Sequence, residues 1–117
     1  MGLIYFSKKL KKSNMKIIES KKFTGKNAWE SLPIASMDGT TVKLHWTNEP
    51  YKWHINNGQE VFAVMDGEVD MHYKDNGEIR VARLETGDIF YADIGTEHTA
   101  HPVGEARILV IEKEGSV

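Results

Sequence analysis

The chain has 117 residues and no cysteine. Since a domain typically has about 100–200 residues, this length predicts a single domain. The lack of cysteine excludes a disulfide scaffold, a thiolate zinc site, a cysteine-ligated iron–sulfur cluster and a cysteine nucleophile. A hydrophobic share of 40% and a charged share of 27% are typical of a globular domain rather than a disordered chain.

Charge is distributed unevenly along the chain, although the net charge is only −2. Residues 1–26 carry eight lysines and one acid, a net charge of +7, whereas residues 27–117 carry −9. We expect residues 1–26 to be a basic, partly disordered extension and residues 27–117 to form the domain. Because the extension has no arginine and few aromatic residues, we expect no nucleic-acid binding.

The first apolar run is too short for a targeting or membrane segment. It covers residues 3–6 and precedes the lysines, whereas a signal peptide needs a positive charge first and then about 7–15 apolar residues. A membrane span needs about 20. We therefore expect a cytoplasmic protein that does not bind membranes. Residues 15–18, Met-Lys-Ile-Ile, also resemble a translation start, which would make residues 1–14 an upstream extension.

From about residue 40 the sequence alternates with period two between glycine turns. The alternating segments are 41–46, 60–65, 68–73, 78–84, 89–92, 98–100 and 107–112. Asp-Gly and Asn-Gly pairs between such segments predict hairpins. The pattern indicates about eight short strands in an antiparallel sandwich or barrel. Only residues 26–36 suggest a helix, of about one turn, which Pro33 would end.

Three polar residues of this region are candidates for chemistry. Glu60 opens a segment that is apolar on both faces, so its carboxylate needs a buried partner unless it reaches solvent beside a turn. His54 precedes a polar turn and His98 opens a short strand, and each alone is more often structural. We interpret the remaining histidines as surface or supporting residues: His45, His72 and His101.

Together, these residues resemble the two motifs of the cupin superfamily. Residues 54–67 contain the histidine, glutamate and glycine of the first motif at the family's spacing, and residues 87–98 contain the glycines and histidine of the second. Three positions differ from the family pattern. Asn56 stands in place of the second histidine, Asp93 in place of a proline and Pro102 in place of an asparagine. Of these, only the first concerns the metal site.

The resemblance implies a double-stranded β-helix, or jelly-roll barrel, with a short irregular N-terminal segment. It also implies that His54, Glu60 and His98 bind a divalent transition metal (Fe, Mn, Ni or Zn) in the barrel mouth. Asn56 would add a weak amide oxygen or leave its position to water, and the missing imidazole should weaken affinity for the late transition metals. Open positions would let the metal bind substrate or activate water.

Apolar and aromatic side chains should line the pocket beside the metal, although plain core packing also explains each of them. The candidates are Trp46, Trp53, Phe62, Val64, Met71 and Tyr91, with Phe90 as the alternative to Tyr91. The last strand offers either Leu109 and Ile111 or Ile108 and Val110. Lys52 and Arg107 are candidate cationic contacts, unless they are exposed.

The resemblance further implies an enzyme that acts on a small carbonyl or carboxylate substrate as a dioxygenase, decarboxylase or isomerase. One alternative is a non-enzymatic sensor or storage module that binds a small ligand. Another is a metal-free sugar epimerase, with His54 or His98 as base and Tyr73 or Tyr91 as acid. Because edge strands of antiparallel jelly rolls often pair between subunits, we also expect a homodimer.

Overall fold

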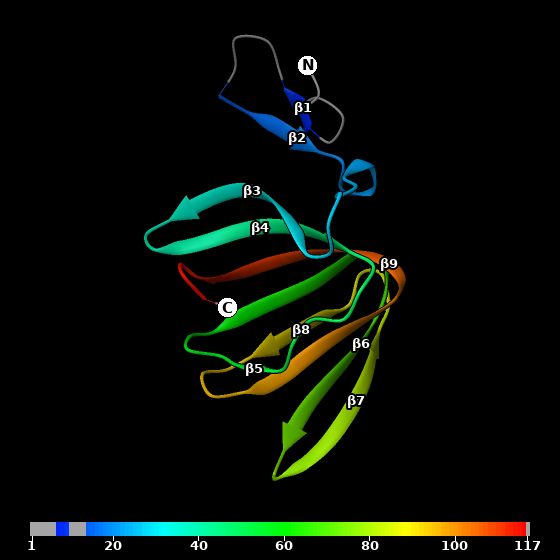
Figure 1. Ribbon diagram of the computed structural model, residues 1–117. Helices are drawn as coiled ribbons and strands as arrows, with labels where there is room; N and C mark the ends of the chain where they lie inside the picture. The colour runs from blue at the N-terminus through cyan, green and yellow to red at the C-terminus, as the bar shows by residue number, and fades with distance from the viewer. Residues whose placement is uncertain (1–6, 10–13, 117) are drawn as a thin grey trace.

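The computed structural model describes residues 7–9 and 14–116, and it shows a chain built from β-strands (Figure 1). The strands are β1 (Ser7–Lys9), β2 (Lys16–Ile18), β3 (Glu30–Met37), β4 (Thr40–Thr47), β5 (His54–Ile55), β6 (Glu60–Asp75), β7 (Glu78–Leu84), β8 (Ile89–Ala92) and β9 (Glu97–Lys113). A three-residue 3₁₀ helix, η2 (Ser20–Lys22), precedes β3. The predicted all-β jelly roll is confirmed. Within the described residues, no helix is long and apolar enough to span a membrane.

Seven strands form one antiparallel sheet, and β1 and β2 form a separate pair. The order is β3-β4-β9-β6-β7, with β5 added to β9 and β8 added to β6. β6 and β9 have 16 and 17 residues and pair from Glu60 with Glu112 to Tyr73 with His98. Both strands bend midway, so the sheet folds back over itself and encloses a core (Figure 1).

The bend in β6 lies at Gly67, where its register with β9 shifts on both sides of Asp66. Gly67 has a φ of 84°, and a Cβ there would lie 2.5 Å from the Glu105 carbonyl oxygen, so only glycine fits. This register shift is a β-bulge, and it changes whether the even-numbered or the odd-numbered residues of β6 are buried. The buried residues are Glu60, Phe62 and Val64 before it and Val69 and Met71 after it.

Buried apolar residues form two clusters on opposite faces of the sheet. The cluster inside the barrel contains Phe62, Val64, Val69, Met71, Leu84, Ala100, Ala106, Ile108 and Val110. The second cluster contains Phe23, Leu44 and Trp46, with Ile18, Leu32 and Ile34 packed against it. Since neighbouring side chains on β4 point to opposite faces, the second cluster turns the alternate residues of β4 toward the barrel interior.

The structure differs from the sequence prediction at the N-terminal end of the domain. Residues 26–36 were expected to make a helical turn, but β3 pairs with β4 instead, because the β4 edge satisfies its backbone groups. Phe23 lies in the predicted extension, yet it is only 3% exposed. Arg107 donates hydrogen bonds to the Phe23 carbonyl and to Thr24 Oγ1 at 2.8 and 2.9 Å. Phe23 therefore packs on the domain, and residues 1–6 and 10–13 of the predicted 1–26 extension fall outside the described residues.

Candidate functional site

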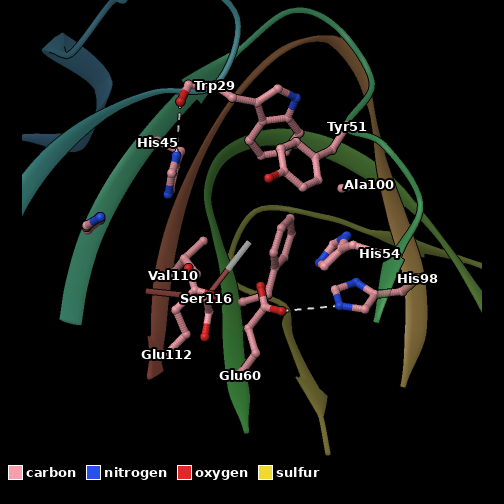
Figure 2. Close-up of a pocket in the computed structure, with 12 residues that line it drawn as sticks. Trp29, His45, Tyr51, His54, Glu60, His98, Ala100, Val110, Glu112 and Ser116 are labelled. Carbon is pink, nitrogen blue, oxygen red and sulfur yellow. Dashed lines mark hydrogen bonds and ion pairs between the residues drawn. The ribbon is translucent and has the colours of Figure 1, made fainter. Parts of the chain in front are cut away.

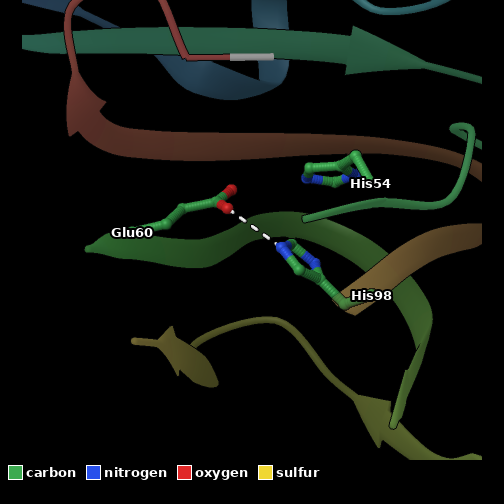
Figure 3. Close-up of side chains that lie close together, drawn as sticks. All are labelled: His54, Glu60 and His98. Atoms are coloured by element: carbon green, nitrogen blue, oxygen red, sulfur yellow. Dashed lines mark ion pairs between the residues drawn. The ribbon is translucent and has the colours of Figure 1, made fainter. Parts of the chain in front are cut away.

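Three polar side chains from different strands converge inside the barrel (Figure 3). His54 on β5, Glu60 on β6 and His98 on β9 each offer one potential ligand atom, and these atoms lie within 4.8 Å of one another. His98 Nε2 is 3.2 Å from Glu60 Oε1, and the two imidazole centroids are 4.2 Å apart. The β5–β9 register pairs His54 with His98, and the inward face of β6 directs Glu60 toward both. The fold thus brings together the three residues that the motif spacing selected.

Asn56 completes the polar cluster. Its side chain is buried, and its Oδ1 lies 2.8 Å from His98 Nε2. Its Nδ2 donates to the Ala92 carbonyl at 3.4 Å. Only the NH₂ group can donate to a carbonyl, so the amide oxygen is the atom that faces the histidine. The structure therefore places an amide oxygen where the family motif has an imidazole.

The donor atoms of this cluster suit a divalent cation. Glu60 Oε1 is buried and, despite its closeness to His98, has no partner in hydrogen-bonding geometry among the described residues; the same is true of His98 Nδ1. A buried carboxylate oxygen without a donor costs free energy, and a coordinated cation would remove that cost. His54 Nδ1 lies 3.1 Å from the Lys52 carbonyl, so a proton on Nδ1 leaves the Nε2 lone pair free for a metal. Two imidazoles, one carboxylate and one amide oxygen fit Fe, Mn, Ni or Zn.

Burial favours the neutral, ligand-competent form of histidine in this region. The pKa of His54 is lowered mainly by burial, and the hydrogen bond to the Lys52 carbonyl only partly offsets that effect. The pKa of His45 is also lowered, again chiefly by burial. Neutral imidazole is the form that binds metals and accepts protons, so both rings are in that form near neutral pH.

The cluster opens into a cavity of about 160 Å³ (Figure 2). Besides the three polar residues, the cavity is lined by Trp29, Lys43, His45, Tyr51, Phe62, Ala100, Val110, Glu112 and Ser116. In Figure 2, His54 and His98 lie on one side and His45 on the other, with Glu60 between them. The rings of Trp29 and Tyr51 pack edge-to-face at 5.1 Å and close one end. The cavity therefore has a candidate metal side, an aromatic end and a second polar side.

The residues of that second polar side were not among the candidates predicted from the sequence. His45 was interpreted as a surface or supporting residue, and Lys43 was not a candidate. Leu44 and Trp46 occupy the outer cluster, which turns Lys43 and His45 inward. Glu112 lies opposite Glu60 in the β6–β9 register. Burial, and secondly the charge of Glu60, raises the pKa of Glu112. Period two shows that a strand has two faces, but only packing shows which one lines the cavity.

Of the six side chains expected to line the pocket, only Phe62 lies among the residues that line this cavity. Trp46 belongs to the outer cluster, packed beside Phe23. Val64 and Met71 do face the barrel interior, but they are buried in its apolar core. These corrections share one cause, since an inward-facing residue can lie in the filled part of a barrel as well as in its open part.

The two remaining aromatic candidates are on the surface. Trp53 is 44% exposed and Tyr91 is 53% exposed. Phe90 is the residue of β8 that faces inward, with its ring centroid 5.7 Å from that of His98. On β9, Ile108 and Val110 are buried on the inner face, which decides between the two alternatives for that strand.

The other charged and histidine candidates lie away from the cavity. Arg107 is buried, but its Nη1 lies 2.9 Å from Asp66 Oδ2. This ion pair stabilises the fold, and the guanidinium is not directed to a substrate. Lys52 is exposed and is not a lining residue. The rings of His72 and His101 pack against each other at 4.1 Å, outside the cavity lining.

Comparisons with known proteins agree with this architecture. Residues 40–112 match the cupin domain. A cupin-2 domain protein from Shewanella frigidimarina NCIMB 400 is 26% identical, with a TM-score of 0.68 over 77% of this chain and 85% of that chain. A cupin superfamily protein from Desulfitobacterium hafniense DCB-2 is 14% identical, with a TM-score of 0.69 over 80% and 85%. No curated protein matches this sequence.

A protein that was solved with Fe(II), named HppE, has the same fold. The Fe(II) form of HppE, solved with an alternative substrate, is 16% identical, with a TM-score of 0.61 over 70% of this chain. The matched part covers 48% of the HppE chain. At this identity the similarity shows the fold alone.

Proposed function

This chain belongs to the cupin family, and we propose that it is a metal-dependent enzyme acting on a small organic substrate that carries a carbonyl or carboxylate group. The observation that carries the proposal is the convergence of one ligand atom each from His54, Glu60 and His98 within 4.8 Å. HppE, which has the same fold, is solved with Fe(II) and with Co(II). The identity of the metal and the reaction class (dioxygenation, decarboxylation or isomerisation) stay open.

In this proposal, His54, Glu60 and His98 would hold the metal, with Asn56 Oδ1 as a fourth ligand atom. The bound metal would supply a Lewis acid that polarises a coordinated carbonyl. Trp29, Tyr51 and Phe62 exclude water from the bound substrate, which strengthens electrostatic interactions in the cavity.

His45 is positioned to move a proton in the same cavity. Its Nδ1 lies 3.3 Å from the Trp29 carbonyl oxygen, so the proton sits on Nδ1 and Nε2 is free to accept another. Its lowered pKa keeps the ring neutral before the substrate binds. We assign His45 as the proton acceptor of the reaction.

The metal-free epimerase has less support. Neither of its expected acids lines the cavity, because Tyr91 is exposed and Tyr73 packs against Phe90 at 5.8 Å. A sensor that binds a ligand without turnover would use the same cavity, and a search for turnover of candidate ligands separates it from an enzyme. The homodimer and the cytoplasmic location stay predictions.

The decisive experiment is elemental analysis of protein purified without added metal, followed by titration with Zn(II) and Co(II). We expect about one metal per chain in the wild type and a loss of at least tenfold in affinity in His98→Ala and in Glu60→Gln. His101→Ala is the matched control, because this histidine lies three residues away but outside the cavity lining. Circular dichroism checks that each variant is folded. A wild type that binds neither metal, or a His98→Ala variant that retains wild-type affinity, contradicts the proposal.

A further inference from the structure

Among the described residues that line the cavity, Lys43 is the only lysine or arginine. It lies on β4, and it faces the cavity because its neighbour Leu44 is buried in the outer cluster. Its side chain is partly buried, and it forms no ion pair with any residue that the structure describes. An ammonium group in a cavity without a protein partner is available to an anionic ligand.

The strand register places Lys43 two strands away from β6, the strand that carries Glu60. Lys43 pairs with Val110 on β9, and Val110 pairs with Phe62 on β6, two residues after Glu60. Adjacent strands are about 4.8 Å apart, so the backbones of β4 and β6 are separated by about 10 Å. The apolar side chain of Val110 on β9 lies between them, beside Phe62 on β6. A ligand that reaches both sides is therefore a small molecule with polar groups at its two ends.

The charges of the cavity favour an anion at the lysine end. A divalent metal is balanced by the carboxylates of Glu60 and Glu112, so Lys43 leaves the loaded cavity with a net positive charge. The charge of Lys43 contributes to lowering the pKa of His45, and it opposes the rise in the pKa of Glu112. The positive charge of Lys43 therefore acts on His45 and Glu112, which line the same side of the cavity.

We propose that Lys43 binds a distal anionic group of the substrate, so that the cavity selects small molecules with a metal-chelating group at one end and a carboxylate at the other. This inference rests on the proposed function. It makes Lys43 a specificity-determining residue rather than a metal ligand, and it separates two roles that different strands supply. The metal side holds the reacting group, and the lysine fixes the opposite end of the substrate.

The test uses the zinc-loaded protein and two probes that differ in one charge. 2-Oxoglutarate has a chelating 2-oxo acid and a distal carboxylate, and its 5-methyl ester has a neutral ester in place of that carboxylate. We expect the wild type to bind the diacid about tenfold more tightly, which is a usual value for one charged hydrogen bond. Lys43→Met should reduce this preference to about twofold or less without changing the zinc content, and Lys43→Arg should retain it. Lys21→Met removes an exposed lysine outside the cavity lining and should leave the preference unchanged.

Two results would overturn the role of Lys43: equal binding of both probes by the wild type, or a preference that persists in Lys43→Met. If Lys21→Met lost the preference for the diacid as fully as Lys43→Met, the preference would arise from the net charge of the protein. That result would also overturn the proposal. Failure of the wild type to bind zinc contradicts the metal centre instead. In that case the same probes are titrated into metal-free protein and followed by NMR chemical shifts. A charge preference that depends on Lys43 then supports the anion site, and its absence overturns it.

Discussion

Asn56 is the residue that distinguishes this site from the histidine-rich form of its motif. Its amide is held by the Ala92 carbonyl, and its oxygen lies 2.8 Å from His98 Nε2. In the absence of a metal, that contact is a hydrogen bond donated by the His98 N–H. Metal binding must replace it, because coordination requires the lone pair of the same nitrogen. In the proposed site, the amide would supply a weaker ligand than imidazole and would also compete for His98.

We predict that Asn56→His strengthens metal binding. The imidazole would add a better ligand for Zn(II) and Ni(II) and would remove the amide oxygen that competes for His98, so affinity should rise by about tenfold or more. Competition with a chromogenic chelator measures the change. Asn57→His is the control, because Asn57 is exposed and directs its Oδ1 to the Ser116 hydroxyl. An equal gain in both variants would show that position 56 has no special role.

At the scale of the element, the bulge in β6 decides which residues face the cavity. Alternation along an unbroken strand would place Glu60 and Met71 on opposite faces, because their numbers differ in parity. The irregular pairing around Gly67 shifts the phase, so both residues are buried on the inner side. The close approach of the Glu105 carbonyl at this point leaves no room for a side chain.

We predict that Gly67→Ala destabilises the fold by about 2 kcal/mol more than Gly77→Ala does. The two glycines have similar φ values, 84° and 81°, so both substitutions share the cost of a left-handed backbone. Only at Gly67 does a Cβ meet another atom, at 2.5 Å, whereas nothing lies within 4 Å of a Cβ at Gly77. Urea unfolding measures both free energies, and equal losses would refute the steric argument.

At the scale of the whole molecule, Phe23 packs against the domain although it lies in the extension expected from the sequence. Phe23 is buried against Leu44 and Trp46, and it covers the outer face of β4. The guanidinium of Arg107 ties the same segment to β9 through the Phe23 carbonyl. Because Leu44 and Trp46 pack under Phe23, their neighbours Lys43 and His45 face the cavity. Phe23 therefore shapes the site indirectly.

We predict that Phe23→Ala lowers the free energy of unfolding by about 3–4 kcal/mol, the usual cost of truncating a buried aromatic residue. Ile17→Ala is the control. Ile17 lies in the same segment but is 47% exposed, so its loss should stay below about 1 kcal/mol. Thermal unfolding followed by circular dichroism compares the two. Similar small losses in both variants would mean that the segment does not pack on the domain in solution.

The sequence by itself determined the class of fold and the three convergent polar residues. Glycine turns and period two are properties of the local backbone, so they predicted hairpins and strands without knowledge of their neighbours. The resemblance to the cupin motifs selected His54, Glu60 and His98, and the structure brings these residues together. The short helix expected at 26–36 failed because a strand partner, which no local pattern reveals, was available in β4.

Only the tertiary structure decided which face of each strand lines the cavity. On β4 the alternation was correctly recognised, but the apolar face packs beneath the N-terminal segment and the polar face supplies Lys43 and His45. The same ambiguity affected β8, where Tyr91 was the expected lining residue but Phe90 is the one that faces inward. The physical reason is that alternation is set by the geometry of a single strand, whereas inside and outside are set by what packs against it.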